Sequence, residues 1–140
     1  MSRPIDTGES QFFDAEKDLW DAKLTPRQAF AMVRTLVRGV PRLRERGGFR
    51  VEVHRNTKAT AYTEVVIVRE TKEILGAERM ILSEREINEH IILHELAHIC
   101  ANTVHGNLLD PKCGHGISFR TWCSILEEHW REIKRRRKTK

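Results

Sequence analysis

The residues with the clearest capacity for chemistry stand in one short run, "HELAH", which places His94, Glu95 and His98 within five positions. Side chains four residues apart lie on one face of an α-helix, so the two imidazoles can converge on a single metal ion. Glu95 points in a neighbouring direction, from which its carboxylate reaches a water on that ion rather than the ion itself. The spacing is typical of zinc hydrolases, whose glutamate serves as general base.

Two helical histidines leave a catalytic zinc ion one protein ligand short. His90 shares the helical face of His94, but one helical turn rises about 5.4 Å, and zinc–nitrogen bonds are only about 2 Å long. We therefore expect His90 to have a supporting or core role. Glu127 and Glu128, on a later helix, remain candidates, and so does Cys113, although thiolates are more typical of structural sites.

Two further histidines follow the helix. A third ligand six residues after His98, with glycine three residues after it, would define another zinc-peptidase pattern, but Val104 and Ala101 hold those positions. His105 therefore misses that spacing. We favour His115, which stands in "GHGISF", where the flanking glycines permit close approach of the backbone.

"HELAH" followed at a distance by "HGISF" resembles the SprT-like zinc metallopeptidases, whose active-site pattern is HExxH and then HGxxF or HGxxW. The run "ERMILSEREINEHIILHELAHIC" is similar to the final strand and metal helix of that family, so the resemblance covers residues 78 to about 126. It implies a zincin-like domain in which His94, His98 and His115 bind Zn²⁺ and Glu95 is catalytic. The family often carries a cysteine-rich zinc ribbon after this domain, and in this sequence a basic tail stands in that place.

Other residues are candidates for supporting roles. Tyr62, on a predicted strand, and His105, in a loop, are candidates for a second donor to the oxyanion of the reaction. Asp110 and Asn102 are candidates for orienting an imidazole. The strand predicted at residues 59–69 is a candidate edge along which an extended peptide substrate lies.

The elements that must position these residues can be read from capping and periodicity. Thr25, Pro26 and Gln28 predict the start of a helix, and a short amphipathic helix is predicted at residues 10–23. Strands are predicted at 49–54, 59–70 and 78–83, with antiparallel pairing favoured for the first two by their short connection. "SERE", at 83–86, predicts a capping box at the start of the metal helix, and a closing helix is predicted from about Ser118.

These elements predict an α+β fold with N-terminal helices, a small three-stranded, mostly antiparallel sheet, a central HExxH helix and a closing C-terminal helix, which the resemblance implies is a zincin-like domain. A chain of 140 residues suits one domain, which we place at 1–133, with a basic tail at 134–140. The sequence contains no apolar run of membrane-spanning length, and the start lacks the apolar region of a secretory signal. With three cysteines in no paired spacing, we expect a cytoplasmic protein without a membrane partner.

The net charge of +5 is concentrated in two blocks. Residues 34–58 carry eight basic groups and two acids, and residues 131–140 carry seven basic groups and one acid. Such blocks attract phosphates, so DNA is a candidate partner. We expect a zinc-dependent metallopeptidase acting on protein or peptide, with nucleic-acid-associated protein as a candidate substrate. The alternatives are a zinc-stabilised nucleic-acid-binding module without catalysis, or a repressor-cleaving regulatory peptidase.

Overall fold

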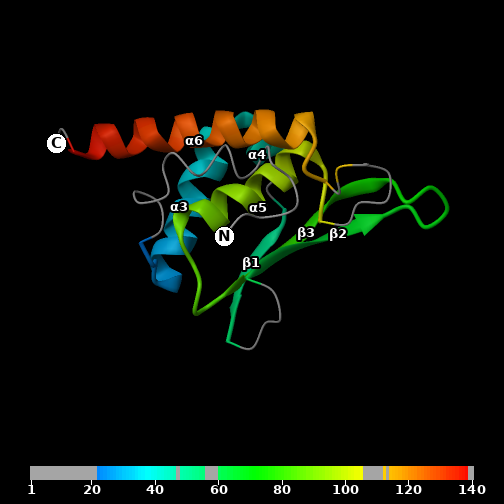
Figure 1. The fold of residues 1–140 in the computed structure, drawn as a ribbon, viewed down its shortest axis with the longest axis horizontal. Helices are drawn as coiled ribbons and strands as arrows, with labels where there is room; N and C mark the ends of the chain where they lie inside the picture. Colours follow the sequence, from blue (N-terminus) through cyan, green and yellow to red (C-terminus); the bar gives the residue numbers. More distant parts are fainter. Residues whose placement is uncertain (1–21, 47, 56–59, 106–111, 113, 139–140) are drawn as a thin grey trace.

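The computed structural model describes residues 22–46, 48–55, 60–105, 112 and 114–138, so the helix predicted at 10–23 lies almost entirely outside the described residues. The described chain is α+β, with four helices over one face of a three-stranded sheet (Figure 1). In chain order its elements are α3 (Pro26–Gly39), α4 (Pro41–Glu45), β1 (Arg50–His54), β2 (Ala61–Ile67), β3 (Ile74–Ser83), α5 (Glu89–Ala101) and α6 (Ile117–Lys138). None of the described helices combines the length and apolar character needed to cross a bilayer.

Helix α3 begins where the capping signals predict. The Thr25 hydroxyl accepts a hydrogen bond from the Gln28 amide at 3.1 Å, and the Gln28 side chain accepts one from the Thr25 amide at 2.8 Å. Pro26 occupies the first turn, where a missing N–H costs nothing. The buried residues of α3 recur at helical spacing and form its core-facing stripe, namely Ala29, Met32, Val33 and Leu36.

The sheet has the strand order β1-β3-β2, with β1 parallel and β2 antiparallel to β3. The prediction that the first two strands pair was wrong, because β3 lies between them and makes the sheet mixed. β3 begins at Ile74, earlier than predicted, and its residues Met80, Ile81 and Leu82 are fully buried. β3, whose last residues are the most deeply buried of the sheet, takes the centre, where both of its edges find backbone partners.

Helix α5 begins later than predicted. The side chain of Asn88 caps it by accepting a hydrogen bond from the helix backbone at 2.9 Å. The predicted cap, Ser83, is instead the last residue of β3, and its amide donates to the carbonyl oxygen of Thr60. Its predicted partner, Glu86, accepts a hydrogen bond from the Thr60 hydroxyl at 2.6 Å. Because the sheet already uses the backbone of Ser83, the helix starts at Glu89.

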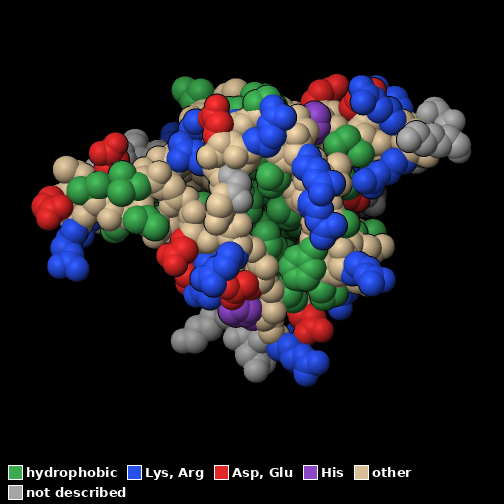
Figure 2. All heavy atoms as spheres, turned by 180° about the vertical axis from the view of Figure 1, so that it is seen from behind, with side chains coloured by type: hydrophobic (Ala, Val, Ile, Leu, Met, Phe, Trp, Pro, Cys, Tyr) green, Lys and Arg blue, Asp and Glu red, His purple; other side chains and the backbone are tan. Residues whose placement is uncertain are grey.

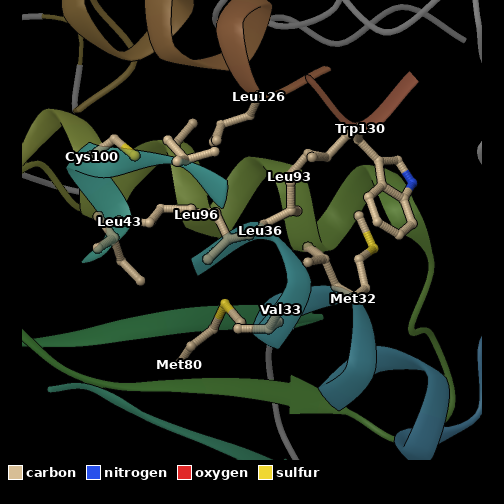
Figure 3. Packing of buried hydrophobic residues seen from close by; sticks show 14 of the residues in the cluster. Met32, Val33, Leu36, Leu43, Met80, Leu93, Leu96, Cys100, Leu126 and Trp130 are labelled. Carbon is tan, nitrogen blue, oxygen red and sulfur yellow. The ribbon is translucent and has the colours of Figure 1, made fainter. Parts of the chain in front are cut away.

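Helix α5 is the centre of the core. Figure 3 shows Leu93 and Leu96 of α5 between Leu126 of α6 and Leu36 of α3, with Met80 of the sheet below. Packed from several sides in this way, α5 places its own polar side chains in surroundings where unpaired polar groups are costly.

Helix α6 runs antiparallel to α5 (Figure 1), since Phe119 contacts His98 whereas Trp130 reaches Glu89 at the start of α5. The buried Glu89 carboxylate accepts hydrogen bonds from the Trp130 indole and, at 3.2 Å, from the Lys134 ammonium group. α6 continues to Lys138, so the boundary expected after residue 133 falls inside a helix. These contacts hold α6 along α5, from His98 near its end to Glu89 at its start.

An apolar depression of about 400 Å³ lies between α3 and β1, on the side of the molecule that faces away from the viewer in Figure 1. Figure 2 shows hydrophobic side chains in a central hollow with Lys and Arg side chains beside it. The lining residues are Phe30, Val33, Arg34, Val37, Arg38, Phe49 and Val51. None of the residues predicted to bind metal lies in this depression.

Candidate metal centre

Four histidines come together at one end of α5. His94 and His98 belong to α5, His105 to the segment that follows it, and His115 directly precedes α6. Their ligand nitrogens all lie within 4.8 Å of one another. Imidazole is a common ligand of transition metals, so this cluster could hold a metal ion.

Three of these nitrogens form a compact triangle. Nε2 of His98 lies 3.1 Å from Nε2 of His94 and 3.2 Å from that of His115, and the third side is 3.4 Å. Zinc–nitrogen bonds of about 2.05 Å in a tetrahedral arrangement place ligand nitrogens about 3.3 Å apart. The triangle therefore has the dimensions of three ligands on one tetrahedral ion.

A hydrogen-bond chain fixes the ring of His98. The Thr103 hydroxyl donates to the Gly114 carbonyl oxygen at 3.1 Å, so its oxygen accepts from Nδ1–H of His98 at 3.0 Å. With the proton on Nδ1, Nε2 of His98 keeps its lone pair, which faces the triangle. Thr103 thus plays the part usually taken by the outer partners of metal-binding histidines.

Burial favours the neutral form of the His98 and His115 imidazoles. His94, His98 and His115 are all buried. Burial, with smaller contributions from His94 and His105, lowers the pKa of His98 to about 2, and burial also lowers the pKa of His115. A low pKa favours the neutral imidazole, which is the form that binds a metal ion.

His115 is positioned by a turn that requires glycine. Gly114 has φ +87°, in the left-handed region, and a Cβ there would lie 2.8 Å from the carbonyl carbon of Val104 and nearer still to its oxygen. After this turn, the fully buried Phe119 of α6 packs against the rings of the triangle, with centroids 4.5 Å from His98 and 4.9 Å from His115. The sequence "GHGISF" thus provides both the close approach and the apolar support.

The side chain of Glu95 is 3% exposed and lies beside the triangle. The hydroxyl of Thr63, on β2, donates to its Oε1 at 2.8 Å. Its Oε2 lies 3.9 Å from Nε2 of both His94 and His105. The Thr63 hydrogen bond therefore holds Oε1, while Oε2 is the oxygen that lies nearest to the cluster.

Several alternative ligands are not brought to the cluster that the described residues form. His90 lies outside it, as the rise of the helix predicts. Glu127 accepts a hydrogen bond from Arg131, and Glu128 is exposed. Cys113 lies outside the described residues.

Among the candidates for supporting roles, His105 lies in the cluster, whereas Tyr62 and Asn102 are placed differently from our expectation. Tyr62 precedes Thr63 on β2, so its side chain points to the opposite face of the sheet. Asn102 is the left-handed C-cap of α5, and its side chain donates to the carbonyl oxygen of Ile74 rather than to an imidazole. Asp110 lies outside the described residues. Neither Thr63 nor Thr103 was singled out from the sequence, whereas His105 was set aside as a metal ligand and kept as a candidate donor to the oxyanion.

Comparisons of this chain with models of protein families, with curated proteins and with solved structures found no match. The resemblance to the SprT-like peptidases therefore rests on the two motifs alone. What the chain does must be inferred from the chemistry of the four-histidine cluster and its neighbouring carboxylate.

Proposed function

We propose that this protein is a zinc-dependent metallopeptidase, in which His94, His98 and His115 bind Zn²⁺ and Glu95 is the general base. The observation that carries the proposal is the triangle of three buried imidazole nitrogens, 3.1–3.4 Å apart, beside the carboxylate of Glu95. Three neutral histidines form a donor set that suits zinc and leaves one position of a tetrahedral ion for water or substrate.

A zinc ion bound there would act as a Lewis acid, lowering the pKa of a water molecule towards neutrality and polarising the peptide carbonyl group. Glu95 would accept the proton of the attacking water on Oε2, the oxygen that faces the cluster. The same carboxyl group would then deliver that proton to the amine that leaves when the peptide bond breaks. The Thr63 hydrogen bond would hold Oε1 throughout these transfers.

The sheet offers a place for the substrate. Strand β2 carries Thr63 and, among the described residues, pairs only with β3, which leaves its other edge open to an extended peptide. Addition of a strand to such an edge is a recurring mode of peptide recognition, because the backbone supplies the hydrogen bonds. This arrangement supports protein or peptide as the substrate class. Protein bound to nucleic acid and a repressor are two particular candidates within that class.

The decisive test compares two substitutions. Glu95→Gln should bind one zinc ion per chain with unchanged affinity and lose hydrolysis of a denatured protein substrate, because the amide cannot accept the proton. His115→Ala should lose most of the zinc, because it removes one side of the triangle. Metal content by mass spectrometry and cleavage followed by gel electrophoresis provide the measurements.

Three outcomes would count against the proposal. Wild-type protein that binds no stoichiometric zinc would refute the metal site. Full hydrolysis by Glu95→Gln would remove the proposed base. Retention of zinc by His115→Ala, with loss in Glu127→Ala or Glu128→Ala, would show that the third ligand is a carboxylate of α6.

The alternative function is a zinc-stabilised nucleic-acid-binding module without catalysis. A purely structural zinc site has no use for a carboxylate beside its first ligand and is closed by four ligands. The nearness of Glu95 to the triangle, and its fixed Oε1, therefore favour the peptidase. The Glu95→Gln variant also separates the two functions, since the module predicts no change in any activity of the protein.

A further inference from the structure

His105 differs from the other three histidines of the cluster. Its side chain is 50% exposed, against 10% for His94, and it lies beyond the C-cap of α5. Its Nε2 is 2.9 Å from Nε2 of His94 and 3.9 Å from Oε2 of Glu95. Its ring stacks on that of His94, with centroids 4.9 Å apart and planes 13° from parallel. His105 therefore lies at the exposed side of the cluster, next to Oε2 of the proposed base.

We propose that His105 is a further catalytic residue, which donates a hydrogen bond from Nε2–H to the peptide carbonyl oxygen as that oxygen gains negative charge. This inference rests on the proposed peptidase function and adds a group to it. No covalent bond to His105 forms or breaks, and its proton stays on Nε2 throughout. The hydrogen bond strengthens as charge develops, so it stabilises the transition state more than the bound substrate.

The geometry favours a donor over a fourth metal ligand. The Nε2 atoms of His94, His98 and His115 lie no more than 3.4 Å apart, as three ligands of one ion do. Every longer distance between ligand nitrogens of the cluster, up to 4.8 Å, involves His105. The three triangle histidines are buried, as residues that must hold an ion are, whereas His105 faces the solvent from which a substrate arrives. His105 is also within reach of the reacting groups, since its Nε2 lies 3.9 Å from Oε2 of Glu95.

The test uses the full-length, zinc-loaded protein and four variants: His105→Ala, His105→Gln, His115→Ala and, as a matched control, His54→Ala. His54 is a partly exposed histidine on β1 that pairs with Glu52 and lies outside the cluster. Zinc affinity is measured by competition with a chromophoric chelator. Peptidase kcat and KM are measured on one peptide. Inorganic phosphate, a tetrahedral anion, is titrated into the cobalt-substituted proteins and followed by visible absorption.

We expect His105→Ala to keep zinc affinity within about threefold of wild type and to lower kcat by roughly 10²- to 10³-fold, the usual effect of removing one oxyanion donor. KM should change little. Phosphate should bind at least tenfold more weakly to His105→Ala, and His105→Gln should recover part of both losses, because its amide still donates. His54→Ala should match wild type in every measurement.

Two results would overturn the inference. Zinc affinity that falls in His105→Ala as far as in His115→Ala would make His105 a fourth ligand. If His105→Ala leaves both kcat and phosphate affinity unchanged, His105 donates no hydrogen bond to the substrate oxygen or to a bound anion. If wild-type protein binds zinc but cleaves no peptide, the proposed function fails, while the phosphate titration still decides whether His105 is an anion donor.

Discussion

At the scale of single residues, Thr63 connects the sheet to the chemistry of α5. Its hydroxyl donates to Oε1 of the almost fully buried Glu95 at 2.8 Å. A buried carboxylate that loses a hydrogen bond is both destabilised and free to turn. In the proposed peptidase, Thr63 would therefore be a positioning residue that acts through Glu95 rather than on the substrate.

Thr63→Val keeps the shape of the side chain and removes the hydroxyl. We expect kcat to fall roughly 10- to 100-fold, as for other partners that orient site groups, with little change in KM or zinc affinity. The free energy of unfolding should fall by about 1–3 kcal/mol, because Oε1 of Glu95 is left without its donor. Steady-state kinetics and urea denaturation measure both effects. Thr63→Ser should restore both values, and equal damage in the serine and valine variants would rule out the hydroxyl as the cause.

Local spacing predicts only part of the site. His94, Glu95 and His98 lie on one helix, so their relation is fixed once that helix forms, and "GHGISF" marked His115 by its glycines. Thr63 reaches Glu95 only through the strand order, which no local pattern specifies. The positions of Thr103 and His105 depend on how the chain leaves α5. The spacing rule from another family of zinc peptidases set His105 aside as a ligand, and it carries no information on whether that residue lies near the cluster.

At the scale of elements, the turn before α6 determines whether His115 reaches α5. Gly114 has φ +87°, and its carbonyl oxygen accepts the hydrogen bond of Thr103, the residue that orients His98. One turn therefore supports two of the three triangle histidines. A side chain at this position would have to displace the backbone of Val104.

Gly114→Ala should lower the free energy of unfolding by more than roughly 2 kcal/mol, since the left-handed conformation costs a non-glycine residue about 1–2 kcal/mol and the overlap with Val104 adds to this. Zinc affinity should fall by about tenfold or more, because His115 and Thr103 move together. Urea denaturation and chelator competition measure these changes. Gly48→Ala is the matched control, because a Cβ there meets no atom within 4 Å. Equal behaviour of the two variants would show that the turn tolerates a side chain.

Capping signals predicted the start of α3 but not that of α5. Thr25 and Gln28 form their box, and no strand of the described sheet uses the backbone of Thr25. Ser83 and Glu86 carry an equivalent pattern, but β3 already uses the backbone of Ser83, and the helix is capped by Asn88 instead. A local signal fails where a tertiary partner competes for the same backbone.

At the scale of the whole molecule, the order of the strands determines which residues meet at the site, and the distribution of charge determines where phosphate groups could bind. The central position of β3 goes with the full burial of its last residues, which the alternation pattern within a single strand does not reveal. The last turns of α6, which ends at Lys138, carry most of the basic block at residues 131–140. Arg135 and Arg136 both pair with Glu132, but their side chains are 60% and 77% exposed. Exposed pairs of this kind contribute little energy and remain available to phosphate groups.

We therefore expect a chain ending at Lys134, which keeps the contact with Glu89, to bind duplex DNA more weakly than the full chain. It lacks five basic residues, and each phosphate contact contributes about 0.9 to the slope of log affinity against log salt. Fluorescence anisotropy at several salt concentrations measures that slope. An identical slope in both chains would show that the end of α6 contacts no phosphate and is only a solvated helix end.

The triangle also links parts of the chain that are separate in sequence, since His98 and His115 stand on either side of the segment 99–114. An ion held by both would act as a cross-link that closes this loop only in the folded state. Ligand binding of this kind stabilises a fold by about 2.7 kcal/mol when the free ion is at 100 times its dissociation constant. The supply of metal would then set how long the folded chain survives, as well as how fast it works.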